Sequence, residues 1–125
     1  MTKKVLSCGQ CSFDHQAISA LFKQLNASIE VSEAHSVGDA LLAVGKQRYN
    51  LILINRIFDR TGEEGLTLIG DLNKKALTEN VPLVLISNFP EAQLAAGQLG
   101  ARAGFGKSQL RDGETSELLR QYLSL

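Results

Sequence analysis

Two short, wholly apolar segments constrain the fold of this chain more than any other feature. The first is LILI at positions 51–54, which ends on the polar Asn55, and the second is VPLVLI at positions 81–86. A short apolar run between polar residues is typical of a strand that is buried on both of its faces. Strands of this kind occur in parallel sheets that are covered by helices on both sides, so these two segments predict the centre of such a sheet.

Segments with helical spacing alternate with the predicted strands along the whole chain. Parallel strands need a crossover connection, which is usually a helix, so five strand–helix units in strict alternation predict a doubly wound α/β fold. The predicted strands cover residues 3–8, 27–32, 49–55, 81–86 and 100–106, and the predicted helices cover 13–25, 36–45, 66–72, a short helix from 88, and 110–123.

Polar residues mark where several of the helices begin. Ser12 is the expected N-cap of the first helix, and Ser36 with Asp39 resembles a capping box that opens the second. Glu63 and Glu64 stand near the start of the third helix, where negative charge is favourable. Pro90 suits the first turn of the fourth helix.

Composition and charge exclude several classes of protein. A chain of 125 residues predicts one domain over residues 1–125. Lys plus Arg and Asp plus Glu are balanced at 13 each, so we expect neither nucleic acid nor a membrane surface as a partner. No apolar run approaches the roughly 20 residues of a membrane span, and the start lacks the pattern of a signal peptide. With two cysteines only, the sequence indicates a cytoplasmic protein.

Asn55 follows the central strand at the position where chemistry is expected. In an open parallel sheet, the ligand crevice lies beyond the carboxyl ends of the strands. Asn55 is therefore the first candidate site residue.

These segments together resemble the receiver domain of bacterial two-component response regulators over essentially the whole chain. The resemblance rests on KVL at 4–6, LILIN at 51–55, VPLVLIS at 81–87, and Gly100-Ala101 followed by Lys107. It implies a flavodoxin-like (βα)5 sandwich with strand order 2-1-3-4-5. It also implies a protein that receives a phosphoryl group on an aspartate from a histidine kinase.

The acidic residues of that family are absent here. The phospho-accepting aspartate would lie at Asn55, whose amide oxygen is a poor nucleophile without charge. The acidic pair that holds Mg²⁺ would fall at Gly9 and Gln10, and Mg²⁺ needs carboxylates. The resemblance therefore indicates a degenerate pseudo-receiver that has no cofactor and is not an enzyme.

Other receiver positions are partly kept. Ser87 keeps the hydroxyl that contacts the phosphoryl group in the family, and Lys107 keeps the basic residue that pairs with that group. Gly104 occupies the position of the family's aromatic switch residue. Phe105, one place later, is expected in the core. The resemblance implies a protein partner, either histidine kinase-like or an output protein. It also implies a homodimer through the fourth helix, fifth strand and last helix.

Lys107 and Arg56 give the predicted crevice an excess of positive charge. One hypothesis is that the crevice binds an anion, or that Lys107 pairs with Asn55 or Ser87 as in a phosphorylated state. We prefer the simpler interpretation, in which Asp59, Glu63 or Glu64 neutralises this positive charge through a surface ion pair.

Cys8 and Cys11 form a C-x-x-C motif between a strand and a helix. A helix N-terminus can activate a thiol, so a thiol-redox or metal-responsive switch is the alternative function. The simpler interpretation is that Cys8 is a core residue and Cys11 a helix-start residue. His15 extends the motif to C-x2-C-x3-H, but no fourth ligand is evident, so no metal site is predicted.

Overall fold

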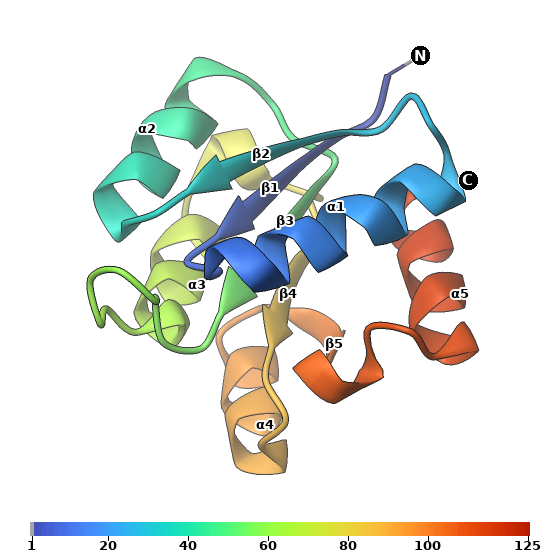
Figure 1. Ribbon diagram of the computed structural model, residues 1–125. Coiled ribbons are helices and arrows are strands. Elements are labelled where there is room, and N and C mark those ends of the chain that lie inside the picture. Colours follow the sequence, from blue (N-terminus) through green and yellow to red (C-terminus); the bar gives the residue numbers. More distant parts are fainter. Residues whose placement is uncertain (1) are drawn as a thin grey trace.

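The computed structural model describes residues 2–125, in which five parallel strands form one sheet in the order β2-β1-β3-β4-β5. This architecture confirms the predicted α/β fold (Figure 1). The strands are β1 (Lys4–Cys8), β2 (Glu30–Ala34), β3 (Leu51–Asn55), β4 (Leu83–Ile86) and β5 (Arg102–Phe105). The helices are α1 (Ser12–Leu25), α2 (Val37–Lys46), α3 (Gly65–Asn73), α4 (Pro90–Gln98) and α5 (Gly113–Leu123), with 3-10 turns η1 (Ala76–Thr78) and η2 (Lys107–Gln109).

Helices cover both faces of the sheet and divide the core into two layers. Successive residues of β3 point to opposite faces, so Ile52 and Ile54 join the cluster that α2, α3 and α4 cover. Leu51 and Leu53 join the cluster under α1 and α5, which lie side by side on the other face (Figure 1). Every residue of β3 is buried, as the apolar run predicts.

Several predicted boundaries are wrong. The strands β4 and β5 each begin two residues later than predicted, at Leu83 and Arg102. The edge strand β2 covers Glu30–Ala34 rather than residues 27–32, because its register follows β1, with Cys8 opposite Ala34. The last helix begins at Gly113 rather than at residue 110, after the turn η2. The N-cap of α1 is Cys11 and not Ser12, since the Cys11 Sγ accepts a hydrogen bond from the Asp14 amide at 3.4 Å.

The capping of α2 is shared between the chain before it and a distant loop. Ser36 Oγ accepts from the Asp39 amide at 3.0 Å, which is the predicted half of the capping box. The Val37 amide donates to Glu63 Oε1 at 3.0 Å. Glu63, which the sequence places at the start of α3, thus satisfies α2 instead.

None of the helices within residues 2–125 has the length and apolar character that crossing a membrane requires.

Candidate functional site

A crevice of about 170 Å³ lies at the carboxyl ends of β3 and β4. Its lining residues come from the ends of these strands, from the loops after them and from η2: Asn55, Arg56, Ile57, Ile86, Ser87, Phe89 and Lys107. The structure thus brings Asn55, Ser87 and Lys107 to one place. Gly9, Gln10 and Gly104 do not line the crevice.

The Asn55 side chain is committed to a structural hydrogen bond. Asn55 is buried, and its Nδ2 donates to the carbonyl oxygen of Gly9 at 3.0 Å. A carboxylate at position 55 would have no proton to donate there and would face the Gly9 carbonyl with a second negative oxygen. The asparagine therefore joins the end of β3 to the turn after β1. An ionised acidic residue at position 55 would instead repel the Gly9 carbonyl oxygen.

The space beside Gly9 is filled by the ring of Phe58. Gly9 has a φ of 77°, and a Cβ at this position would overlap the Phe58 ring. Phe58 is 1% exposed and belongs to the cluster that includes Cys8 and Ile54. Where the resemblance places the first of two metal-binding acids, this chain has an aromatic ring against a glycine.

Backbone hydrogen bonds hold Phe58 in position. The Phe58 amide donates to the Glu63 carbonyl, and the Gly62 amide donates to the Phe58 carbonyl, each at 2.8 Å. Ile57 and Glu64 form an antiparallel bridge across the base of the same loop. The Asp59 amide donates to the Gly9 carbonyl at 3.0 Å, so the β3–α3 loop closes directly over the end of β1.

Gln10 is buried as well. Its Nε2 donates to the Cys8 carbonyl at 3.4 Å, while its Oε1 has no hydrogen-bond partner. Residues 2–125 contain no group of three or more His, Cys, Asp or Glu side chains placed to hold a metal ion. One buried amide oxygen supplies none of the carboxylate ligands that Mg²⁺ prefers.

Lys107 forms an ion pair that the sequence did not reveal. Its Nζ lies 2.9 Å from Asp14 Oδ2 on the first turn of α1. The hypothesis that Lys107 pairs with Asn55 or Ser87 is therefore wrong. The preferred interpretation was that a carboxylate neutralises the positive charge of the crevice. A carboxylate does pair with Lys107, but it belongs to Asp14 and not to Asp59, Glu63 or Glu64.

Arg56 and Ser87 are also engaged. The Arg56 guanidinium lies 4.9 Å from the centroid of the Phe89 ring, a cation–π distance. Ser87 Oγ accepts from the Phe89 amide at 3.2 Å. Phe89 thus contacts both residues at the mouth of the crevice, a role that the sequence did not reveal.

Position 104 excludes an aromatic side chain. A Cβ on Gly104 would overlap the Leu85 carbonyl oxygen, and the Gln93 amide lies against the same position. Gln93 Nε2 donates to the Leu85 carbonyl at 2.9 Å and to the Ser87 carbonyl at 3.1 Å. Phe105, which follows, is buried as predicted.

The two cysteines lie in different environments. Cys8 is fully buried in β1, and this burial raises the pKa of its thiol well above the ordinary value, which keeps it protonated and unreactive. Cys11 is half-buried and caps α1. His15 contacts Glu33 of β2, with 3.5 Å between Nε2 and Oε1. These positions favour the simpler interpretation of the motif.

We expect one thiol to react in the folded protein and both to react in denaturant. Iodoacetamide at neutral pH should modify Cys11 and leave Cys8 unmodified, because the Cys8 sulfur is buried and its pKa is raised. Mass spectrometry of the alkylated protein measures this. The Cys11→Ser variant is the matched control and should remain unmodified. Rapid modification of Cys8 in the folded protein would revive the redox hypothesis.

Comparisons with known proteins concern the fold. No family model matches the chain, and no curated protein matches it by sequence. A protein assigned as a response regulator from Chloroflexus aurantiacus J-10-fl is similar, with a TM-score of 0.87 and 18% identity over 100% of both chains. The receiver domain of a DNA-binding response regulator (merR) from Colwellia psychrerythraea 34H has a TM-score of 0.84 and 14% identity, covering 98% of this chain and 99% of that one. The chemotaxis response regulator CheY4 of Vibrio cholerae has a TM-score of 0.77 and 18% identity, covering 98% and 100%. This chain therefore has the fold of response regulator receiver domains.

Proposed function

We propose that this chain is a pseudo-receiver of a bacterial, cytoplasmic two-component type pathway. It is not phosphorylated, it catalyses no reaction, and it acts by binding a protein partner. The receiver fold supports the signalling class. The state of the crevice supports the loss of phosphotransfer.

The packing of Phe58 against Gly9 carries this proposal. Loss of a carboxylate can be compensated by a neighbouring one, but the ring leaves no room for any side chain at position 9. Asn55 supplies no nucleophilic carboxylate and uses its amide nitrogen to hold the Gly9 carbonyl. Lys107, which could attract an anion into the crevice, is neutralised by Asp14.

A partner surface formed by α4, β5 and α5 suits this function. Ala92 and Ala96 of α4 are buried in the core, so these two residues are not available for contact with a partner. Leu94 is 67% exposed on α4, and Leu99 at its end is also exposed. A histidine kinase-like or output protein that docks here would bury these leucines. Self-association through this same face is the other use that the receiver resemblance implies.

Restoring the aspartate alone should not restore phosphorylation. The wild-type chain and the Asn55→Asp variant are incubated with acetyl phosphate and Mg²⁺, and intact mass is recorded. We expect no added phosphoryl group on either, because Gly9 and Gln10 provide no carboxylate for Mg²⁺ and Phe58 closes the position.

A receiver domain with its full acidic set, treated in parallel, is the positive control. Magnesium-dependent labelling of Asn55→Asp would show that the ring does not block the site, and labelling of the wild-type chain would refute the proposal outright.

A further inference from the structure

A cleft of about 320 Å³ lies at the amino ends of the strands, on the opposite edge of the sheet from the crevice at Asn55. Three cations line this cleft: Lys3 before β1, Arg48 before β3 and Arg102 at the start of β5. Most of its other lining residues are polar, and none of the described residues that line it is acidic. Most ligand pockets are mainly apolar, so this polar, cationic lining favours a strongly polar anion.

A second cleft, of about 470 Å³, adjoins the first, and Arg102 and Asn80 line both of them. Lys74 and Lys75, which follow α3, add two more cations to the second cleft. Glu79 is the one acid among its described lining residues. Although the chain has no net charge, its fold thus gathers five cations from four separate places in the sequence around the two clefts. Such a local excess of positive charge attracts anions.

The two arginines keep their charge available for a ligand. In the described part of the chain, no carboxylate forms an ion pair with Arg48 or Arg102. Arg48 Nη2 donates to the Glu79 carbonyl oxygen at 2.6 Å, which fixes the guanidinium without cancelling its charge. The Tyr122 hydroxyl donates to the Ala103 carbonyl oxygen at 2.7 Å, which holds the end of α5 against β5 beside Arg102. The walls of the first cleft are therefore tied together by contacts within the protein.

A neutral donor accompanies these cations. Asn50 lines the first cleft, and its Oδ1 accepts from the Lys4 amide at 2.8 Å. This contact uses the oxygen of the side-chain amide inside the protein and leaves Nδ2 as a donor beside the cleft. Phosphate oxygens accept both charge-assisted hydrogen bonds from arginine or lysine and hydrogen bonds from neutral N–H groups, so the donors of this cleft match a phosphate group.

We propose that the two clefts together bind one small molecule that carries two phosphate groups. One phosphate group lies between Lys3, Arg48 and Arg102. The other lies between Arg102 and the lysine pair that follows α3. A guanidinium group can donate to several anionic oxygens at once, so Arg102 contacts both phosphate groups. This proposal goes beyond the loss of phosphotransfer and does not depend on it.

Amide shifts in two-dimensional NMR spectra at physiological ionic strength test the proposal. The wild-type chain is titrated separately with inorganic phosphate, pyrophosphate and fructose 1,6-bisphosphate, which differ in the number and spacing of their phosphate groups. We expect saturable shifts at Lys3, Asn80 and Arg102. One of the two-phosphate compounds should have a dissociation constant about tenfold or more below that of inorganic phosphate, because its second phosphate adds charge-assisted contacts.

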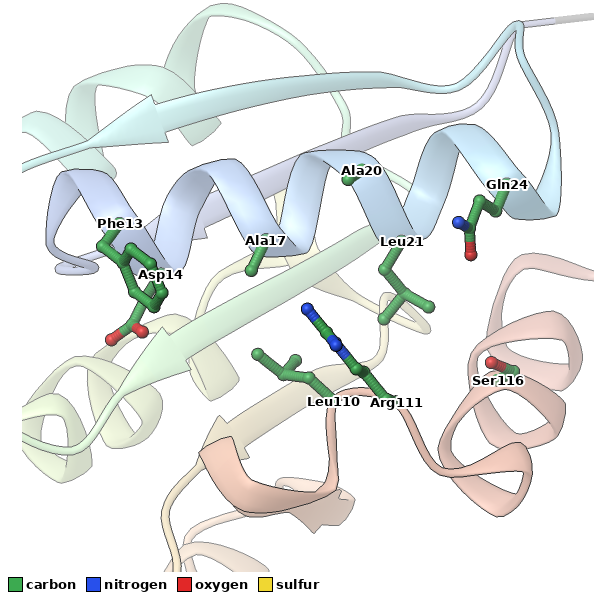
Figure 2. A pocket seen from close by; sticks show the side chains of 9 residues that line it. All are labelled: Phe13, Asp14, Ala17, Ala20, Leu21, Gln24, Leu110, Arg111 and Ser116. Atoms are coloured by element: carbon green, nitrogen blue, oxygen red, sulfur yellow. The ribbon is translucent and has the colours of Figure 1, made fainter.

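Three variants assign the contacts. Arg102→Gln should raise the dissociation constant of that compound about tenfold or more, because both clefts share this cation. Arg102 is exposed, so the variant should fold, and circular dichroism checks this. The double variant Lys74→Gln, Lys75→Gln should lose the preference for two phosphate groups and keep the binding of inorganic phosphate. Arg111→Gln is the matched control and should bind like the wild type, because Arg111 is also exposed but points towards α1 and lines neither cleft (Figure 2).

Several results would overturn the proposal. They are the absence of saturable shifts with every probe, equal affinities for one and two phosphate groups, and equal effects of Arg102→Gln and Arg111→Gln. Shifts centred on Ser87 and Lys107 would assign the anion to the crevice at Asn55 instead. Binding of a short single-stranded DNA, without binding of either two-phosphate compound, would assign the clefts to nucleic acid.

Discussion

Replacing Gly9 with alanine should lower the free energy of unfolding by about 2–5 kcal/mol, which is a large part of the stability of a domain of this size. The cost has two sources. Gly9 has a φ of 77°, which disfavours any side chain, and the added Cβ would overlap the buried Phe58 ring. Urea denaturation followed by circular dichroism measures the change.

Gly62 provides the matched control for this prediction. Its φ is 74°, close to that of Gly9, but an added Cβ would lie in open space. Gly62→Ala should therefore cost only about 1–2 kcal/mol, the backbone part alone. In a Phe58→Leu background the cost of Gly9→Ala should fall towards that of Gly62→Ala, because the smaller side chain leaves room. Equal costs for the two glycine variants in the wild-type background would mean that Phe58 does not fill the position.

Gly65→Ala should be destabilising by about 3 kcal/mol, the upper end of the usual cost of overpacking. An added Cβ would overlap the carbonyl oxygen of Asn55, and the Gly65 amide donates to the Arg56 carbonyl at 2.7 Å. Both groups belong to the backbone, so no side-chain rotation can relieve the overlap. The β3–α3 loop or the start of α3 would have to move, and thermal or urea denaturation would report the loss.

Gly70, in the middle of the same helix, should respond in the opposite direction. A Cβ there would meet Leu99 Cδ2 at 3.6 Å, an ordinary van der Waals contact. Gly70→Ala should therefore stabilise the protein by about 0.5–1 kcal/mol through helix propensity. If both variants change stability by the same amount, the close approach of α3 to the end of β3 is not what position 65 requires.

The centre of the sheet was predictable because its signal is local. LILI at 51–54 is apolar at every position, and β3 is buried at every position. The edge strand β2 was placed three residues too early, because an edge strand buries little and its sequence carries little periodicity. The N-cap of α1 was misassigned since serine is the more common cap, whereas the thiol of Cys11 lies one residue nearer the strand.

The sequence predicted where the candidate site lies and which carboxylates it lacks, but not the contacts that fill it. Asn55, Gly9 and Gln10 show directly that three carboxylates are absent. The sequence did not reveal that the Phe58 ring fills the space beside Gly9. Phe58 is one apolar residue within a polar loop, and hydrophobic periodicity cannot predict its contact with Gly9. The ion pair between Lys107 and Asp14 joins η2 to α1, two elements that lie far apart in the sequence. Contacts of this kind depend on tertiary structure, and a single sequence does not encode their partners in any local pattern.

The burial of Phe58 changes the mechanical character of the β3–α3 loop. Loops at this edge of an α/β sheet are usually among the segments that open most readily. Here the loop contributes a ring to the same cluster as Leu6 and Ile52, so it cannot lift away without exposing the interior. We therefore expect the amide protons of this loop to exchange together with those of the core. If the proposed function holds, a partner would therefore bind surfaces other than this edge of the sheet.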